Sequence, residues 1–356
     1  MNSKSKGKVC VTGAGGFVAS WLIKRLLLSG YQVIGTVRDP GDSKKVGHLW
    51  MLEGATERLE LVRADLLEEG SFDEAVSGCD GVFHTASPVL AIPKSSSSSS
   101  NIKSEILEPA IEGTLNVLRS CKRNLPRLRR VVLTSSSSTV RVREMTSLTP
   151  TVDEAVLLDE SSWSSEELCE RLGIWYALSK TLAEKAAWEF CNRNGIDLVT
   201  VTPSFVIGPN LPAVLSPTAA DVAALLRGEK EKFEWHGRMG YVHIDDVAVA
   251  HILLYEKEEA KGRYICSSTV VDIQDLASIL SQRFPFLPIP IPTSFKKHAR
   301  PVYDFDTSKL KGLGMRRLRS IEEMFDDCVG SLIMQGHLSP TPIIQPPSSP
   351  SHTSLV

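Results

Sequence analysis

The sequence predicts an α/β protein with a doubly wound parallel sheet and a smaller C-terminal region. Short apolar runs of strand length alternate with longer segments of helical period through about the first 200 residues. A glycine-rich turn lies between the first strand and the first helix, and the regular alternation ends at Pro203. Together these observations predict a Rossmann-type sheet, followed by a region in which prolines and short helices alternate.

Each expected strand is a short, mostly apolar run, and each expected helix repeats its apolar residues every three or four positions. The expected strands are Lys8–Thr12, Gln32–Val37, Leu59–Arg63, Gly81–Thr85, Arg130–Thr134 and Leu198–Thr202. The expected helices are Phe17–Ser29, Glu105–Arg123, Trp175–Arg193 and Ile321–Gln335. We interpret the serine run from Ser95 to Ser100 as a flexible surface linker, and the Pro/Ser-rich residues 339–356 as a disordered tail.

Composition argues against several classes of protein. The 40 Lys and Arg against 42 Asp and Glu leave a net charge of -2, so we expect no nucleic-acid partner. The seven cysteines are scattered without a C-x-x-C pair, which argues against a disulfide framework or a structural zinc site and favours a reducing compartment. No hydrophobic signal region opens the chain, and no apolar stretch reaches the roughly 20 residues of a membrane span. We therefore expect a cytoplasmic protein that binds no metal.

The stretch VCVTGAGGFVASWL has the spacing of a dinucleotide-binding turn, with Gly13, Gly16 and Ala19 three residues apart. Glycine permits a tight turn and lets a pyrophosphate approach the amides at the positive end of a helix. A small third residue permits close packing of the helix on the strand. An ordinary tight turn is the alternative, but the position between a strand and a helix favours a dinucleotide site.

The end of the second expected strand, GTVRDPGDSKK, favours NADP over NAD. NAD-binding sites place an acid there, which bonds the ribose 2′-hydroxyl. Here Arg38 stands at the strand tip, and Lys44 and Lys45 follow in the next turn. A guanidinium and an ammonium suit a 2′-phosphate, which an acid would repel. Asp39 keeps NAD as an alternative, and a solvated basic turn without a ligand is another.

The stretch GIWYALSKTLAEKAAWEF places Tyr176 and Lys180 four residues apart near the start of a helix, so both side chains leave the same face. A phenol titrates at about 10 in water, and a neighbouring ammonium lowers that pKa by stabilising the phenolate. Such a pair can act as an acid–base catalyst. The Y-x-x-x-K pattern often arises by chance at a surface, but its position downstream of a dinucleotide turn favours an active site.

Together these motifs resemble the extended short-chain dehydrogenase/reductase family over nearly all of residues 7–338. The shared motifs are TGxxGxxA from Thr12 to Ala19, an acid at Asp65, HTAS from His84 to Ser87, a serine after the fifth strand, YxxxK, and PSFVIGP from Pro203 to Pro209. Within the family, TVRDPG, EGTLNVLRSC, SKTLAE, YVHIDDVA and GRYICSS are similar to the plant group of dihydroflavonol reductases, cinnamoyl-CoA reductases and tetraketide α-pyrone reductases.

The closest resemblance is to the tetraketide α-pyrone reductase branch, through HLWMLEGATERL, LTSSSSTVR, KFEWHGRMGYVHIDDVA and EEMFDDC. That branch reduces a polyketide carbonyl to a hydroxyl in making sporopollenin precursors for the pollen wall. Cinnamoyl-CoA reductases have an NWYCY-type stretch where this chain has GIWYALSK, and dihydroflavonol reductases have an asparagine at the position of Arg141. Dihydroflavonol, cinnamoyl-CoA and aromatic aldehyde reduction remain alternatives. A nucleotide-sugar epimerase and a non-catalytic NADP-sensing protein are rival functions.

The resemblance implies that NADPH/NADP+ binds across the strand ends and that Ser136, Tyr176 and Lys180 are catalytic. Tyr176 would protonate the developing alkoxide, and Lys180 would lower the tyrosine pKa and bond the nicotinamide ribose. Relatives that read TSSAGTV align with Ser136, which regular strand alternation also favours, whereas an early bend would favour Ser137. The implied cofactor-binding residues are Gly13, Gly15, Gly16, Phe17, Val18, Arg38, Lys45, Asp65, Leu66, Thr85, Ala86, Ser87, Tyr176, Lys180, Pro203 and Val206.

The same resemblance implies a domain organisation and a set of partners. Residues 7–205, with 241–268 returning to them, would form the NADP-binding domain, and residues 206–338 would mainly bind substrate. The HIDD stretch from His243 to Asp246 is expected to be structural rather than a metal site. The expected partners are a small polyketide or phenolic carbonyl compound and other biosynthetic enzymes, with the surface of the endoplasmic reticulum as a second location.

Overall fold

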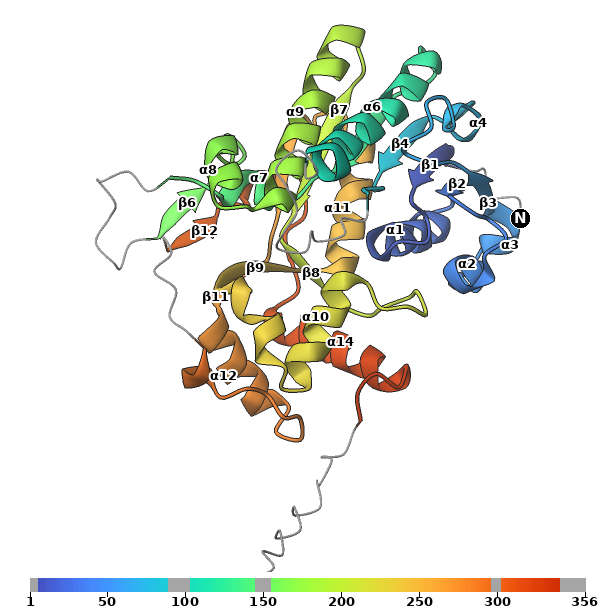
Figure 1. Ribbon diagram of the computed structural model, residues 1–356. Helices are drawn as coiled ribbons and strands as arrows, with labels where there is room; N and C mark the ends of the chain where they lie inside the picture. The colour runs from blue at the N-terminus through green and yellow to red at the C-terminus, as the bar shows by residue number, and fades with distance from the viewer. Residues whose placement is uncertain (1–5, 89–102, 145–154, 296–301, 340–356) are drawn as a thin grey trace, which may run out of the picture.

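The computed structural model describes residues 6–88, 103–144, 155–295 and 302–339 (Figure 1). Its main sheet contains β1 (Lys8–Thr12), β2 (Gln32–Val37), β3 (Leu59–Arg63), β4 (Gly81–His84), β5 (Arg130–Thr134), β7 (Leu198–Pro203) and β10 (Gly262–Cys266). These strands run in the order β10-β7-β5-β4-β1-β2-β3, and every neighbouring pair is parallel. The predicted doubly wound parallel sheet is therefore confirmed.

Helices cover both faces of this sheet. The helices of this part are α1 (Phe17–Leu28), α2 (Ser43–Trp50), α3 (Ala55–Arg58), α4 (Asp73–Val76), the π-helix η1 (Lys103–Leu107), α6 (Glu108–Arg123), α7 (Ser138–Arg141), α8 (Glu166–Arg171), α9 (Trp175–Asn194) and α11 (Ile244–Glu256). Alternate residues of β1 point to opposite faces: Val9 and Val11 pack with α1 and α11, whereas Cys10 packs with α4, α6 and α9. Each face therefore has its own apolar core.

The C-terminal region adds a second, smaller sheet and a separate apolar core. Its elements are β8 (Phe205–Ile207), α10 (Pro217–Leu226), the 3-10 helices η2 (Lys230–Lys232) and η3 (Glu234–His236), β9 (Arg238–His243), β11 (Thr269–Asp272), α12 (Ile273–Arg283), η4 (Pro292–Ser294) and α14 (Ile321–Met334). The strand pair β6 (Val156–Leu158) and β12 (Tyr303–Phe305) and the short helix α13 (Ser308–Gly312) complete the fold. Between β9 and β11 the chain returns to the main sheet as α11 and β10.

Four of the six expected strands match the structure to the residue, and the other two differ at one end. β4 ends at His84 because the N–H groups of Thr85 and Ala86 donate to the Thr12 hydroxyl, at 3.1 and 3.0 Å, instead of continuing a ladder. The expected helix Glu105–Arg123 is split into η1 and α6, with Pro109 in the first turn of α6. The serine run from Ser95 to Ser100 and the tail beyond residue 339 lie outside the described residues.

The HIDD stretch joins three segments that are distant in the sequence. His243 caps α11 by accepting the backbone N–H of Asp245 at 3.0 Å. The Asp245 carboxylate, 3% exposed, pairs with Arg25 of α1 and with Arg319 just before α14. Asp246 accepts the backbone N–H of Arg319 at 2.7 Å. These contacts hold the C-terminal region against α1, which is the structural role expected for this stretch.

Replacement of Asp245 by Asn tests this link. The substitution leaves two arginines, about one-third exposed, without their shared carboxylate. We expect the free energy of unfolding to fall by about 2–3 kcal/mol, somewhat less than for a fully buried pair because solvent screens the arginines. Urea denaturation measures the change. In the control Arg317→Met, an arginine that is 79% exposed in its pair with Glu323, the loss should stay below about 0.5 kcal/mol. Equal losses in the two variants would contradict the assignment.

Candidate active site

The predicted site residues gather at the carboxyl edge of the main sheet, around the point where the strand order reverses. The chain runs from β1 outward to β3, then returns to the other side of β1 and continues through β4, β5, β7 and β10. In open α/β sheets, ligands bind in the crevice at such a reversal.

The glycine turn between β1 and α1 leaves no room for side chains. Gly13 has a φ of 70°, and a Cβ atom there would lie 3.1 Å from the Cα of Ala86. A Cβ atom on Gly15 would lie 2.9 Å from the carbonyl oxygen of Lys45. Helix α1 begins after Gly16 without a side-chain cap and without an acid in its first turn. Its first amides therefore form a site suited to an anion such as a phosphate.

The Thr12 hydroxyl ties this turn to the HTAS stretch. It accepts N–H groups from Thr85 and Ala86, so its own proton is left for Nδ1 of His84, 2.8 Å away. Thr85 returns a hydrogen bond to the Thr12 carbonyl at 2.5 Å. Burial and, to a smaller extent, the charge of Lys180 lower the pKa of His84 to about 3, so this imidazole is neutral at physiological pH.

The basic residues predicted to select NADP lie at the tip of β2 and the start of α2. Arg38 is exposed and forms no ion pair or side-chain hydrogen bond with another described residue. Lys45 pairs with Asp42 at 3.0 Å. Asp39, the acid that left NAD as an alternative, accepts the N–H of Gly41 at 2.9 Å within its own turn. The charge of Arg38 is therefore available to a ligand at this edge.

The turn after β3 is fastened to α6. The Asp65 carboxylate accepts the N–H of Leu67 at 2.9 Å. The Leu66 carbonyl accepts a hydrogen bond from Asn116 of α6 at 2.8 Å, and its side chain packs beside Gly113. Asp65 and Leu66 thus stand at the outer end of the same edge, beyond β2.

The serine run bends out of β5 at Ser136 and enters α7. Ser135 points to the α9 side and donates to the Glu184 carboxylate at 2.5 Å. Ser136 accepts the N–H and the hydroxyl of Ser138, at 3.2 and 2.9 Å, and its hydroxyl lowers the pKa of the Tyr176 phenol. The four serines therefore differ in their surroundings, and Ser136 is the one that acts on the predicted tyrosine.

The next residues extend the contact between β5 and β7. Ser137 donates its backbone N–H to the Pro203 carbonyl at 2.8 Å, which brings Pro203 beside the serine run. Val206 lies three residues further on, half-buried in β8. Ser87, after the HTAS strand, is exposed.

Tyr176 is 52% exposed, and the pKa of its phenol is nevertheless raised. The surrounding protein disfavours the charged phenolate, while the Ser136 hydroxyl and the charge of Arg141 act in the opposite direction. The expectation that Lys180 lowers this pKa is not met, because the cation with that effect is Arg141, at the end of α7. The sequence offered no signal for this role, since Arg141 reaches Tyr176 only through the fold.

Lys180 lies one helical turn beyond Tyr176, but its amino group points to the sheet. It donates to the carbonyl of Thr134, the last residue of β5, at 3.1 Å. Removal from solvent lowers the pKa of Lys180 to about 8, even though the charge of Glu184 favours the ammonium form. Lys180 is therefore a half-buried cation at the edge of the sheet, close to neutral His84.

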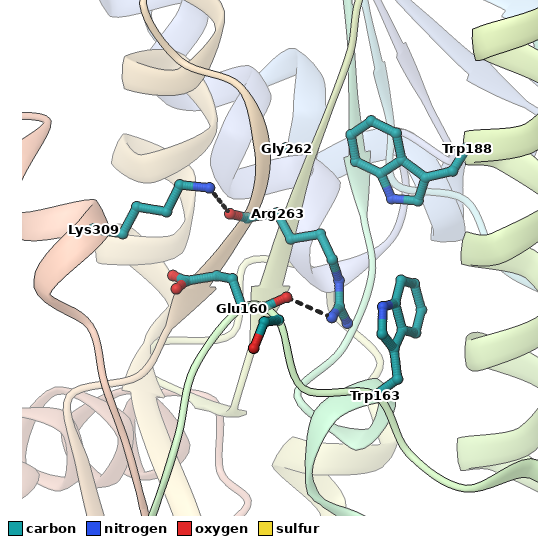
Figure 2. Close-up of a pocket in the computed structure, with 7 residues that line it drawn as sticks. Glu160, Trp163, Trp188, Gly262, Arg263 and Lys309 are labelled. Carbon is teal, nitrogen blue, oxygen red and sulfur yellow. Dashed lines mark hydrogen bonds between the residues drawn. The ribbon is translucent and has the colours of Figure 1, made fainter.

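A surface pocket of about 400 Å³ lies near the amino end of β10, away from the predicted catalytic residues (Figure 2). It is lined by Glu160, Ser161, Trp163, Trp188, Gly262, Arg263 and Lys309. None of the sequence-predicted site residues lines it. Only Arg263 connects it to the site among the described residues, through a buried ion pair with Glu184.

The described residues contain no group of three or more His, Cys, Asp or Glu side chains placed to hold a metal ion. In the same segments, every helix is too short or too polar to cross a membrane. All seven cysteines are buried free thiols.

Comparison with known proteins places this geometry in a family. The model of the NAD dependent epimerase/dehydratase family matches residues 9–266. The chain is 64% identical to tetraketide alpha-pyrone reductase 1 of Arabidopsis thaliana over 336 residues, covering 94% of this chain and 98% of that protein. It is 45% identical to a cinnamoyl-CoA reductase of Medicago truncatula, covering 88% and 93% of the two chains.

Solved structures give the same result. Vestitone reductase from alfalfa has a TM-score of 0.77 and 36% identity, covering 94% of this chain and all of that one. The yeast methylglyoxal/isovaleraldehyde reductase Gre2, complexed with NADPH, has a TM-score of 0.74 and 28% identity, covering 93% and 100%. The chain therefore belongs to the NAD dependent epimerase/dehydratase family, the extended short-chain dehydrogenase/reductases.

Proposed function

We propose that this protein is an NADPH-dependent reductase that converts a carbonyl of a tetraketide α-pyrone to a hydroxyl, in making sporopollenin precursors for the pollen wall. The observation that carries the proposal is the grouping of Ser136, Tyr176 and Lys180 at the carboxyl edge of the sheet, where the Ser136 hydroxyl acts on the pKa of Tyr176 and Lys180 lies one helical turn away. The substrate class is supported by the 64% identity to an Arabidopsis reductase of that name.

The residues at this edge fit NADPH. The uncapped start of α1 suits the pyrophosphate, and the exposed guanidinium of Arg38 suits the 2′-phosphate. When bound, NADPH supplies the hydride that reduces the carbonyl carbon. The proposed cofactor-binding residues are Gly13, Gly15, Gly16, Phe17, Val18, Arg38, Lys45, Asp65, Leu66, Thr85, Ala86, Ser87, Tyr176, Lys180, Pro203 and Val206.

Tyr176 is the proposed acid. Its raised pKa keeps the phenol protonated near neutral pH, ready to protonate the oxygen on which negative charge develops. Ser136 would hold that oxygen beside the phenol, with its own orientation set by the two hydrogen bonds from Ser138. The phenolate left after proton transfer is stabilised by Ser136 and by the charge of Arg141. Lys180 would bond the nicotinamide ribose.

The domain organisation follows as part of the proposal. Residues 7–205, joined by 241–268, would form the NADP-binding domain, and residues 206–338 would mainly bind substrate. The position of β10 in the main sheet and the separate core of the C-terminal region support this division. A cytoplasmic location is proposed from the scattered cysteines, which favour a reducing compartment, and association with other biosynthetic enzymes at the endoplasmic reticulum is proposed from the resemblance.

The substrate is tested by following NADPH oxidation with a panel of carbonyl compounds. The panel contains tetraketide α-pyrones, dihydroflavonols, cinnamoyl-CoA thioesters and aromatic aldehydes. We expect the highest kcat/KM with the pyrones, and a higher value for another class would replace the proposed substrate.

A reductase should also purify largely without cofactor. A tightly retained nucleotide with no NADPH consumption would favour an epimerase.

Replacement of Tyr176 by Phe tests the proposed acid. The variant loses the phenolic proton but keeps the ring, so we expect kcat to fall by about 100- to 10,000-fold while NADPH affinity stays nearly unchanged. Steady-state rates and NADPH fluorescence titration measure the two quantities. A variant that retains more than about a tenth of the wild-type rate would exclude Tyr176 as the acid.

Replacement of Arg38 by Leu tests cofactor selection. Loss of a charge-assisted contact with the 2′-phosphate should raise KM for NADPH by about 10- to 100-fold, with no change in KM for NADH. Arg63→Leu is the matched control, since Arg63 stands at the tip of the neighbouring strand β3 but pairs with Glu68 at 2.8 Å. If both coenzymes were affected equally, Arg38 would have no role in selecting the phosphate.

Replacement of Arg141 by Met tests the electrostatic support of Tyr176. Without this cation we expect the pKa of Tyr176 to rise and kcat to fall, because the phenolate becomes less stable. The pKa is read from phenolate absorbance as the difference between each enzyme and its Tyr176→Phe counterpart. The control is Arg143→Met, two residues along, where the side chain bonds Ser162. An unchanged difference titration would show that Arg141 does not act on Tyr176.

A further inference from the structure

One buried acid close to the proposed site has no role in the mechanism above. Glu184 lies four residues beyond Lys180 on α9, so the two side chains share a helix face. Glu184 is 0% exposed, although acids are almost never fully buried unless they are paired. A carboxylate in this position is costly unless its oxygens are bonded and its charge is balanced.

The carboxylate of Glu184 is bonded on both oxygens. One oxygen accepts the Ser135 hydroxyl at 2.5 Å, and the other accepts the Thr200 hydroxyl of β7 at 3.0 Å. Arg263 of β10 balances the charge, with its Nε 2.8 Å from the carboxylate. These partners come from three strands of the main sheet, so the carboxylate has a defined position beneath the catalytic edge.

Arg263 is itself held firmly from the surface side. Its guanidinium donates to the carbonyls of Glu160 and Ser162, at 2.9 and 2.6 Å, and to the Thr139 hydroxyl of α7 at 2.8 Å. It also lies over the ring of Trp163, 3.7 Å from the centroid, at the wall of the pocket drawn in Figure 2. The ion pair therefore runs from a surface pocket to a residue one turn from Lys180.

We propose that Glu184 is a positioning residue for Lys180: the buried carboxylate of Glu184, held by Ser135, Thr200 and Arg263, keeps the neighbouring ammonium charged at the catalytic edge. This inference rests on the proposed function, because it assigns Lys180 a role that requires its charge. Glu184 acts through Lys180 and touches neither the substrate nor the cofactor in this assignment.

The other charged and titratable groups around Lys180 do not take this role. His84 of β4 and His251 of α11, which bonds the Thr134 side chain, have pKa values lowered by burial to about 3 and 4, so both are neutral. Arg141 of α7 acts on Tyr176, and Arg263 of β10 is not among the charges that act on Lys180. Among the described residues, Glu184 is the charge that favours the ammonium form of Lys180.

The direction of the pH effect follows from the sign of this interaction. Burial disfavours the ammonium form, so Lys180 loses its proton as pH rises through about 8. Removal of the Glu184 charge takes away the opposing effect and lowers that value further. If the loss of the Lys180 proton limits activity at high pH, activity should therefore be lost at a lower pH when Glu184 is replaced.

The test is the pH profile of kcat/KM for NADPH, which reports the free enzyme, in wild type and in Glu184→Gln. We expect the alkaline limb of wild type near pH 8 and that of the variant about one unit lower, so that relative activity at pH 9 falls about tenfold. The control Glu189→Gln removes an exposed carboxylate from the same helix, where it pairs with Arg193. Its limb should coincide with that of wild type.

A purely structural acid would lower stability and rate without moving the limb, and an unmoved or upward-shifted limb in folded Glu184→Gln would overturn the proposal. If that variant does not fold, Glu184→Gln/Arg263→Gln leaves no unpaired buried charge and should show the same downward shift. If neither variant folds, the Glu184–Arg263 ion pair is needed for stability alone, and this result would also count against the proposal.

The proposed function fails separately, if wild type oxidises no NADPH with any carbonyl of the panel. The inference is then read from the pH dependence of NADPH affinity by fluorescence, which needs no substrate. The same downward shift in Glu184→Gln would support it, and coincident titrations would overturn it.

Discussion

The buried carboxylate of Glu184 needs a cation beside it, and Arg263 supplies that charge. This ion pair connects the catalytic edge of the sheet with the surface near the start of β10. Glu184 is fully buried, and its partners come from β5, β7 and β10. Because hydrogen bonds are directional where apolar packing is not, this pair holds α9 at a defined height against the sheet. The position of Tyr176 and Lys180 on α9 therefore depends on a polar contact beneath them.

On the other side of the strand reversal, the hydroxyl of Thr12 likewise fixes the position of a neighbouring segment. Thr12 bonds the last residue of β4 and the two residues after it, and this brings Ala86 against Gly13 so closely that only glycine fits. The anion site at the start of α1 and the HTAS stretch are thus joined by hydrogen bonds. An apolar residue at position 12 would leave two half-buried N–H groups without this partner.

Sequence periodicity was sufficient for features that depend on neighbours in the chain. The strands, the glycine turn and the Tyr176–Lys180 spacing follow from local pattern, and the structure has each of them. The choice among the serines depended on where β5 bends, which a local pattern does not specify. The prediction that Lys180 lowers the pKa of Tyr176 was wrong. Two residues on the same helix face can direct flexible side chains differently, and here the amino group of Lys180 points to the Thr134 carbonyl.

The residues missed by sequence reasoning have non-local partners. Arg141 acts on Tyr176 from another helix, and Glu184 meets Arg263, 79 residues away in sequence. A weak signal for Glu184 was present, since an acid on the helix face that carries Tyr176 and Lys180 faces the sheet rather than solvent. Its charge balance could not be read from the chain, because the cation that neutralises it belongs to the last strand of the sheet.

The protonation states at the site also bear on the direction of the proposed reaction. At pH 7 a lysine with a pKa of about 8 is roughly nine-tenths charged, and a tyrosine with a raised pKa is almost wholly neutral. The resting site thus holds a proton donor beside a cation, which is the state that carbonyl reduction requires. Alcohol oxidation would instead need the phenolate as a base, and the surroundings of Tyr176 disfavour that form. The protonation states of the site near neutral pH therefore match those that carbonyl reduction requires.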